Sequence, residues 1–386
     1  MPKISILLSC ALLSVVSAGA QELVPAADAE KLIPAFDKAS SNSLKCQIEQ
    51  WKPSLDFAFR FDAGYVVDCR LGLFEGKQTS VWVYARVTPE GKSPSLLREE
   101  YRLPEITPEM RHGLDPRKLK HELGMSGAFG VGEGDYSVEV LAIDDRSRSC
   151  RKRWKMHVAV DRSQRNVPLV IKPLTVESLE HAAWDIQAPQ RGQGVRLTVL
   201  LDAAPMNPYE SSLRAWDRAF LLESLYSLLR HTPCKSVRVV AFNLEQQREI
   251  FRYEPFDHAG FTRLILALRE TETATVSVRA LKKRNSPEFL AALATQELAA
   301  TQPSDAVIFL GPNGRMTAKP NSQLLSAKKA DSPPFFYFEY YPWMGANFPD
   351  AIQQLTKTLD GRTFAVHSPA EFGLAIQKML VQLKQE

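Results

Sequence analysis

The chain has 386 residues, of which 45% are apolar and 24% are charged, and its formal net charge is +4. This length is sufficient for two domains with separate hydrophobic cores. So small a charge gives no sign of nucleic-acid binding, and the sequence has no recognition-helix or zinc-finger pattern. We therefore expect a globular protein of two domains with no nucleic-acid partner.

Residues 1–20 have the pattern of a secretory signal peptide. Lys3 precedes an apolar stretch, Ile4–Val16, and the Ala-Gly-Ala sequence that ends at Ala20 is typical of a cleavage site. We predict cleavage after Ala20 and export to the periplasm, the cell envelope or the medium. An uncleaved anchor and a lipoprotein modified at Cys10 are the alternatives, but the apolar stretch is short for both. No later segment is long enough to span a membrane.

Four cysteines follow the signal peptide, with neither a CxxC pair nor a zinc-like spacing. Disulfides are the default in an oxidising compartment. We predict a Cys46–Cys150 disulfide, which would join the first strand of the N-terminal domain to its last hairpin. Cys46–Cys69 is the alternative, and Cys234 stands apart from the others.

Residues 44–162 are predicted to form an antiparallel β-sandwich, preceded by a partly helical or disordered extension over 21–43. Short segments with alternating apolar residues are separated by Gly, Pro, Asp and Lys, as in sandwich domains. The basic run Arg146–Lys155 has two interpretations, a hairpin with solvated arms or a patch for an anionic surface. The strand-like segments are LDFAFRF, AGYVVDCRLGLF, TSVWVYARV, DYSVEVLAID and RWKMHVAV.

Residues 163–194 are predicted to be a linker, and residues 195–386 an α/β domain. Strand-like and helix-like segments alternate in this second half, which favours a doubly wound, mostly parallel sheet with helices on both faces. Apolar residues, Trp216 among them, recur at helical spacing after the first strand.

The second half has a recognisable order of segments: VRLTVLLDAAP, LLESLYSLL, SVRVVAFN, FTRLILAL, DAVIFLGPNG and LDGRTFAVHSPAEFGLAIQKML. From Arg196 to Leu383 this order resembles a von Willebrand factor type A domain. More narrowly, the chain is similar to exported VWFA-related proteins of Acidobacteria-type bacteria, and the stretches GEGDY and RSCRKRW resemble their preceding β-domain. The resemblance implies a type A fold and a protein-binding function without catalysis.

Type A domains bind Mg²⁺ through Asp-x-Ser-x-Ser, a loop threonine and a later aspartate, because Mg²⁺ prefers hard oxygen ligands. Here Asp202 is retained, but Ala204 and Met206 replace the two serines, and the later position in FLGPNG has no carboxylate. Thr262 matches the loop threonine, although we prefer to interpret it as a helix N-cap. Asp202 and Thr262 are therefore predicted to be vestigial, with no metal and no other cofactor bound.

No other catalytic signature is present in the sequence. It lacks Gly-x-Ser-x-Gly, His-Glu-x-x-His and a dinucleotide fingerprint. Ligands of open α/β sheets bind at the carboxyl ends of the strands. We place a candidate partner surface there, with aromatic side chains as anchors. Its predicted residues are Asn207, Asn313, Arg315, Tyr340, Tyr341 and Trp343.

These observations predict an exported, non-enzymatic protein that binds an unidentified protein or cell-surface partner through a metal-free site. One alternative is a Mg²⁺-dependent adhesion module that uses Asp202. The other is an uncharacterised hydrolase.

Overall fold

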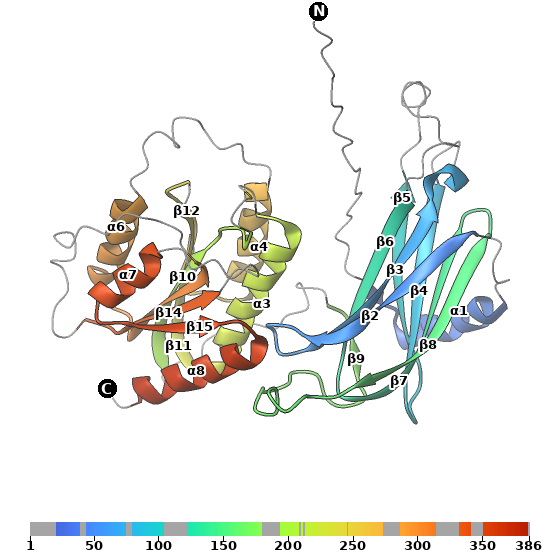
Figure 1. Ribbon diagram of the computed structural model, residues 1–386, viewed down its shortest axis with the longest axis horizontal. Coiled ribbons are helices and arrows are strands. Elements are labelled where there is room, and N and C mark those ends of the chain that lie inside the picture. The colour runs from blue at the N-terminus through green and yellow to red at the C-terminus, as the bar shows by residue number, and fades with distance from the viewer. Residues whose placement is uncertain are drawn as a thin grey trace, which may run out of the picture. The chain divides into compact units, whose positions relative to one another are not determined.

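The computed structural model divides into two compact units (Figure 1). The first unit comprises 1–54, 61–159 and 171–180, and the second comprises 55–60, 160–170 and 181–386. The segment predicted as a linker therefore supplies residues to both units. The structure describes residues 21–38, 44–74, 79–103, 122–179, 194–207, 210, 213–244, 246–272, 286–313, 332–340 and 350–384.

The first unit contains two antiparallel sheets. Their strands are β1 (Glu22–Leu23), β2 (Cys46–Leu55), β3 (Phe61–Arg70), β4 (Thr79–Pro89), β5 (Ser95–Leu103), β6 (Glu122–Val131), β7 (Gly134–Asp144), β8 (Ser149–Val158) and β9 (Val176–Glu177). One sheet has the order β1-β5-β4-β7-β8 and the other the order β2-β3-β6-β9. Hairpins such as β7–β8 favour this arrangement, because a short turn can join only antiparallel strands.

The core of the first unit follows from the two-residue period of its strands. Along β4, fully buried residues alternate with partly buried ones, as a strand with one face on a core requires. A short 3₁₀ helix, η1 (Leu71–Phe74), follows β3. Helix α1 (Ala26–Lys38) packs Phe36 and Ala29 against Leu96 and Leu141 of the five-stranded sheet.

The predicted Cys46–Cys150 disulfide is confirmed. It joins β2 in one sheet to β8 in the other, with Cα atoms 6.2 Å apart. Cys69 is a buried free thiol, so the Cys46–Cys69 alternative is wrong. Cys234 is also a free thiol.

The second unit contains a six-stranded sheet. Its strands are β10 (Val195–Asp202), β11 (Cys234–Asn243), β12 (Arg248–Tyr253), β13 (Ala306–Pro312), β14 (Phe335–Tyr340) and β15 (Arg362–Val366). They are arranged in the order β12-β11-β10-β13-β14-β15. Four of the pairings are parallel, and β12 pairs antiparallel with β11. The central strands are apolar along their whole length because both faces are buried.

Helices cover both faces of this sheet. They are α3 (Ala215–His231), α4 (His258–Glu272), α6 (Ser286–Leu298), α7 (Ala351–Thr358) and α8 (Pro369–Leu383). In β10, Val199 and Leu201 face the core that contains residues of α3, α4 and α8, while Leu200 faces the core that contains residues of α6 and α7. This division follows from the alternation of side chains along a strand. Among the described residues, no helix is long and apolar enough to cross a bilayer.

The segment Leu55–Arg60 differs from its prediction. LDFAFRF was expected to be a strand of the sandwich, but residues 56–60 form the turn between β2 and β3. Leu55–Arg60 belongs to the second unit, where Ala58 and Phe59 are fully buried in the core. The alternating pattern therefore reflects burial of a turn.

The predicted fold class is wrong for the chain as a whole. We expected a doubly wound, mostly parallel type A-like sheet preceded by an antiparallel β-sandwich, whereas nine of the described strands lie in two antiparallel sheets and the third sheet is only partly parallel. The prediction of a von Willebrand factor type A fold is therefore also wrong. Sequence periodicity indicates that a segment is a strand but carries no information about the direction of its neighbour, which hairpins and crossovers decide.

Candidate functional site

Three polar residues lie at the C-terminal ends of neighbouring strands of the six-stranded sheet, which we call its carboxyl edge. Strands β10, β13 and β14 are parallel, so their carboxyl ends lie at one edge. Asp202 ends β10, Glu339 is near the end of β14, and Asn313 follows β13. Their exposed fractions are 1%, 2% and 7%, so this edge is a buried polar layer at these positions.

Asn313 and Glu339 are hydrogen-bonded to each other. The Asn313 Nδ2 donates to Glu339 Oε1 at 2.7 Å, and the Asn313 backbone N–H donates to the carbonyl of Tyr340 at 3.3 Å. A buried carboxylate is costly unless it receives such bonds. Glu339 therefore holds the segment after β13 against the end of β14.

Tyr337 and Asp350 form a second contact of this edge. The Tyr337 hydroxyl lies 2.9 Å from Asp350 Oδ2 and 2.9 Å from the carbonyl oxygen of Pro312. Asp350 Oδ1 accepts the N–H groups of Ile352 and Gln353 at 2.7 and 3.3 Å, so Asp350 is the N-cap of α7. Burial, followed by the negative charges of Asp350 and Glu339, raises the pKa of Tyr337 well above its usual value. Its hydroxyl therefore stays protonated.

The segment after Asp202 is fixed by backbone and amide bonds. The Ala203 N–H donates to the Phe242 carbonyl at 2.7 Å, and Asn243 Nδ2 donates to the Ala203 carbonyl at 2.8 Å. Gly311 faces this segment so closely that a Cβ there would lie 2.8 Å from the Cβ of Asp202. The backbone of β13 therefore packs directly on Asp202.

The first turn of α3 also binds the segment that follows Asp202. Asp217 Oδ1 accepts the Met206 N–H at 3.0 Å, and Asp217 Oδ2 accepts the Arg214 N–H at 3.0 Å. Burial raises the pKa of Asp217, and these two bonds oppose the shift. Trp216, its neighbour, is 54% exposed, although its helical spacing suggested a core position. Trp216 is thus an exposed aromatic side chain at the carboxyl edge.

Thr262 lies neither in a loop nor at a helix N-cap, the two positions predicted for it. It is exposed within α4, one turn after the helix begins, and its Oγ1 donates to the His258 carbonyl at 3.1 Å. The side chain of Asp257 accepts the Gly260 N–H at 2.8 Å at the start of this helix. The N-cap interpretation of Thr262 is therefore wrong.

The predicted partner surface is not supported at the positions that the structure describes. Tyr340 is 1% exposed, and its ring centroid lies 4.6 Å from that of Phe220 in the core. Asn313 is buried against Glu339, and Asn207 is partly buried with its Nδ2 2.9 Å from Glu210 Oε1. Arg315, Tyr341 and Trp343 lie outside the described residues.

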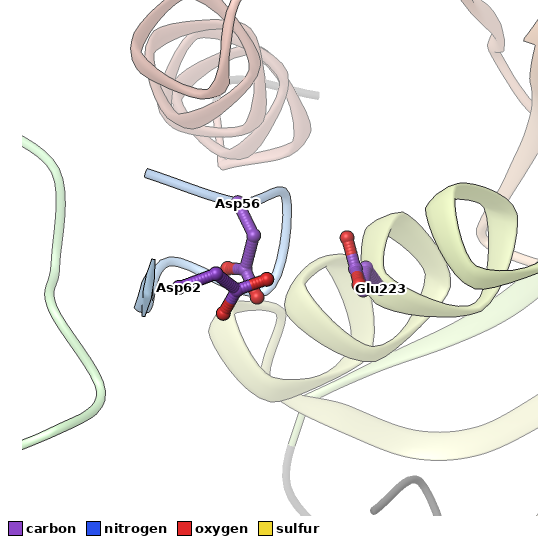
Figure 2. A group of neighbouring side chains, drawn as sticks. All are labelled: Asp56, Asp62 and Glu223. Carbon is purple, nitrogen blue, oxygen red and sulfur yellow. The ribbon is translucent and has the colours of Figure 1, made fainter. Parts of the chain in front are cut away.

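A second polar group lies within the second unit (Figure 2). Asp56, in the turn segment Leu55–Arg60, accepts hydrogen bonds from the Arg60 backbone N–H at 2.8 Å and from Arg60 Nη2 at 2.9 Å. Both side chains are buried, at 7% and 5% exposure. Glu223 of α3 lies beside them. Figure 2 also labels Asp62, which belongs to the first unit.

The charge of Glu223 is disfavoured by its surroundings. Burial raises the pKa of Glu223 to about 8, and the negative charge of Asp56 adds to the shift. Arg60 and a hydrogen bond from the Phe57 backbone oppose it. Since Asp56 is already paired with Arg60, these groups serve to hold the turn Leu55–Arg60 against α3.

The basic run Arg146–Lys155 forms part of the β7–β8 hairpin, as one of its two interpretations proposed. Arg151 Nη1 lies 3.1 Å from Glu139 Oε1, and Arg153 also pairs with Glu139. Arg148 pairs with Asp144 at 2.7 Å. These three arginines therefore have acidic partners within the hairpin, which counts against a free basic patch.

Several buried polar residues were not identified from the sequence. Glu339 interrupts an apolar strand, and Asp350 precedes a helical segment as N-caps do, so both carried a recognisable signal. Tyr337, Asp217 and Glu223 carried none. Their roles depend on neighbours distant in the sequence.

Comparison with known proteins identifies no family. No protein-family model matches the chain, and no curated protein matches it by sequence. Nothing found supports the suggested kinship with type A domains. The chain is similar at 9% identity and a TM-score of 0.23 to a hypothetical protein of Pyrococcus horikoshii, over 32% of this chain and 99% of that one.

Two further solved structures are similarly distant. A superoxide reductase of Archaeoglobus fulgidus is 10% identical with a TM-score of 0.20, over 29% of this chain and 89% of that one. A β-glucuronidase of Bacteroides uniformis is 10% identical with a TM-score of 0.20, over 84% of this chain and 46% of that one. At these TM-scores the similarities carry no argument about fold or activity.

Proposed function

We propose that the protein is an exported, non-enzymatic protein that binds another protein or a cell-surface partner through the carboxyl edge of its six-stranded sheet. The observation that carries the proposal is the exposure of Trp216 at this edge. Tryptophan is enriched among interface anchors, because burying its ring removes a large apolar area from water. Trp216 replaces Tyr340 as the anchor expected at this edge.

The carboxylates of the edge support a binding role over a catalytic one. Glu339 is hydrogen-bonded to Asn313, and Asp350 is hydrogen-bonded to Tyr337 and to α7. Each carboxylate thus stabilises the fold. Export is supported by the signal-like N-terminus and by the disulfide between two sheets, since structural disulfides persist in oxidising compartments.

Site-specific photo-crosslinking tests the binding proposal. A benzoylphenylalanine in place of Trp216 should give a discrete adduct in the envelope of the producing cell. The same group in place of Lys357, which is exposed on α7, serves as the control. Trp216→Ala should weaken binding of the captured partner by about 2 kcal/mol or more without lowering the melting temperature. Absence of an adduct at position 216, or equal adducts at both positions, would refute the proposal.

The two alternative functions, a Mg²⁺-dependent adhesion module and a hydrolase, are tested by separate measurements. Calorimetric titration with Mg²⁺ and Mn²⁺ should give no binding heat, and a heat abolished by Asp202→Asn would establish the metal-dependent adhesion module. Screens for esterase, glycosidase and phosphatase activity should give no turnover. Turnover abolished by Asp202→Asn would establish the hydrolase.

A further inference from the structure

A surface groove lies between helix α8 and the edge strand β15 of the second unit. Its volume is about 700 Å³, and its lining includes Arg362 at the start of β15 and residues on the outer side of α8. The two elements are in contact along the C-terminal part of the chain (Figure 1). The residues that line the groove are Arg362, Leu374, Gln377, Lys378, Val381 and Gln382.

The groove exposes apolar surface that a folded protein usually buries. Leu374 is 48% exposed and Val381 is 57% exposed. They are seven residues apart on α8, which places them on the same side of the helix, two turns apart. Phe372 and Met379, on the opposite side, are fully buried in the core. Covering Leu374 and Val381 would remove apolar area from water.

The charged residues of the groove are both cations. Arg362 and Lys378 are exposed, and no acidic residue is among the described lining. The Arg362 guanidinium lies 5.2 Å from the centroid of the Phe364 ring, within the range of a cation–π contact. In the described part of the chain neither cation has a carboxylate in an ion pair. The groove is therefore complementary in charge to an acidic ligand.

Strand β15 contributes an open edge of the sheet. It is the last strand in the sheet order, and its one partner among the described strands is β14. An edge strand presents N–H and C=O groups to which an extended peptide can bind. The side chains of such a peptide alternate between the two faces of the sheet, so every second side chain would lie toward α8.

We propose that this groove binds an extended segment of a partner protein, which adds as a strand to the edge of β15 and carries both acidic and apolar side chains on the face turned toward α8. Apolar side chains contact Leu374 and Val381, and carboxylates pair with Arg362 and Lys378. This inference rests on the proposed function, that the second unit binds a protein, and it names a second surface and the chemistry of the segment bound there.

Fluorescence anisotropy with a labelled eight-residue peptide tests the proposal. Its odd positions carry valine and glutamate in turn and its even positions carry threonine, so that one face of the strand presents both apolar and acidic side chains. A valine–lysine peptide has lysine at the glutamate positions. The mature chain should bind the acidic valine–glutamate peptide at least about tenfold more tightly than the valine–lysine peptide, because charge complementarity sets the preference. Lys378→Glu leaves one cation and one anion in the groove, so it should weaken binding of the acidic peptide by at least about tenfold and remove the preference. Lys357→Glu, an exposed charge reversal on α7, is the matched control and should leave the affinity within about twofold.

N-methylation tests the strand pairing separately from the side chains. The N–H groups of an extended peptide point alternately to its two edges. One peptide is methylated on the odd backbone nitrogens and the other on the even ones, so each has the hydrogen-bond donors of one edge blocked. One should lose binding and the other should keep it, because only one edge of the peptide donates to β15. Equal effects of the two peptides would overturn strand addition.

Other outcomes also overturn the proposal. One is equal affinity for the acidic and basic peptides, and another is an unchanged affinity of Lys378→Glu for the acidic peptide. A third is self-association of the chain that Lys378→Glu abolishes, because a second copy of the chain would then occupy the groove. If the peptide does not bind but Trp216 still gives its adduct, the proposed function stands and the groove proposal fails. If the peptide binds and Trp216 gives no adduct, the carboxyl-edge proposal fails instead.

Discussion

The Tyr337 hydroxyl lies 2.9 Å from Asp350 Oδ2, and both residues are almost completely buried. Tyr337 belongs to β14, and Asp350 caps α7. The contact therefore couples a central strand of the six-stranded sheet to a helix on its face.

Tyr337→Phe should lower the free energy of unfolding by about 1–3 kcal/mol, because it removes the hydroxyl that lies within hydrogen-bond distance of the buried Asp350 carboxylate. Asp350→Asn keeps an oxygen for the helix cap and should cost less. The double variant should lose less than the sum of the two, since the residues share one contact. Chemical denaturation of the four proteins measures this coupling, and strictly additive losses would contradict the role assigned to the pair.

Gly311→Ala should destabilise the second unit by about 1–3 kcal/mol, the usual cost of overpacking. The added Cβ would lie 2.8 Å from the Asp202 Cβ, and the nearby atoms are mostly backbone. Both Gly311 and Gly91 have a positive φ, of 159° and 69°, but a Cβ at Gly91 would meet no atom within 4 Å, so Gly91→Ala provides a comparison without the close contact. An unchanged melting temperature for Gly311→Ala would show that β13 does not pack closely on Asp202.

Replacing Cys46 and Cys150 by alanine should lower stability by about 2–5 kcal/mol, the range for native disulfides that close long loops. The disulfide closes a sequence separation of 104 residues. Reductant should destabilise the natural chain to a similar extent and leave the double variant unchanged. If reductant destabilised both proteins equally, its effect would not come from the Cys46–Cys150 disulfide, and the stabilising role assigned to that disulfide would be contradicted.

Glu223 should make the stability of the second unit depend on pH. Its pKa is about 8 in the folded chain and near 4.5 in the unfolded chain. Between these values the folded state binds more protons, so stability decreases as pH rises from about 4.5 to about 8. Glu223→Gln should flatten this part of the profile, whereas Glu288→Gln, on the exposed side of α6, should not. Denaturation midpoints at pH 5, 6, 7 and 8 measure the difference, and parallel profiles for Glu223→Gln and the natural chain would refute the assignment.

The sequence was sufficient for features that depend on local pattern. It located most strands and helices of the second unit, because their apolar residues repeat at the period of the element. It also predicted the Cys46–Cys150 pairing, although Cys46–Cys69 remained open. Asp350, which directly precedes a helical segment, carried a local N-cap signal.

The tertiary structure decided the features that depend on distant neighbours. LDFAFRF alternates like a strand, yet Phe59 is buried in the core of the second unit because the turn it belongs to packs there. Tyr340 was expected on the partner surface but is buried, and Trp216 was expected in the core but is exposed. The sequence could not show this, because burial depends on which elements cover a side chain. The fold class of the chain as a whole was misjudged because a side-chain period of two is common to parallel and antiparallel strands, and the connections and partners determine which one forms.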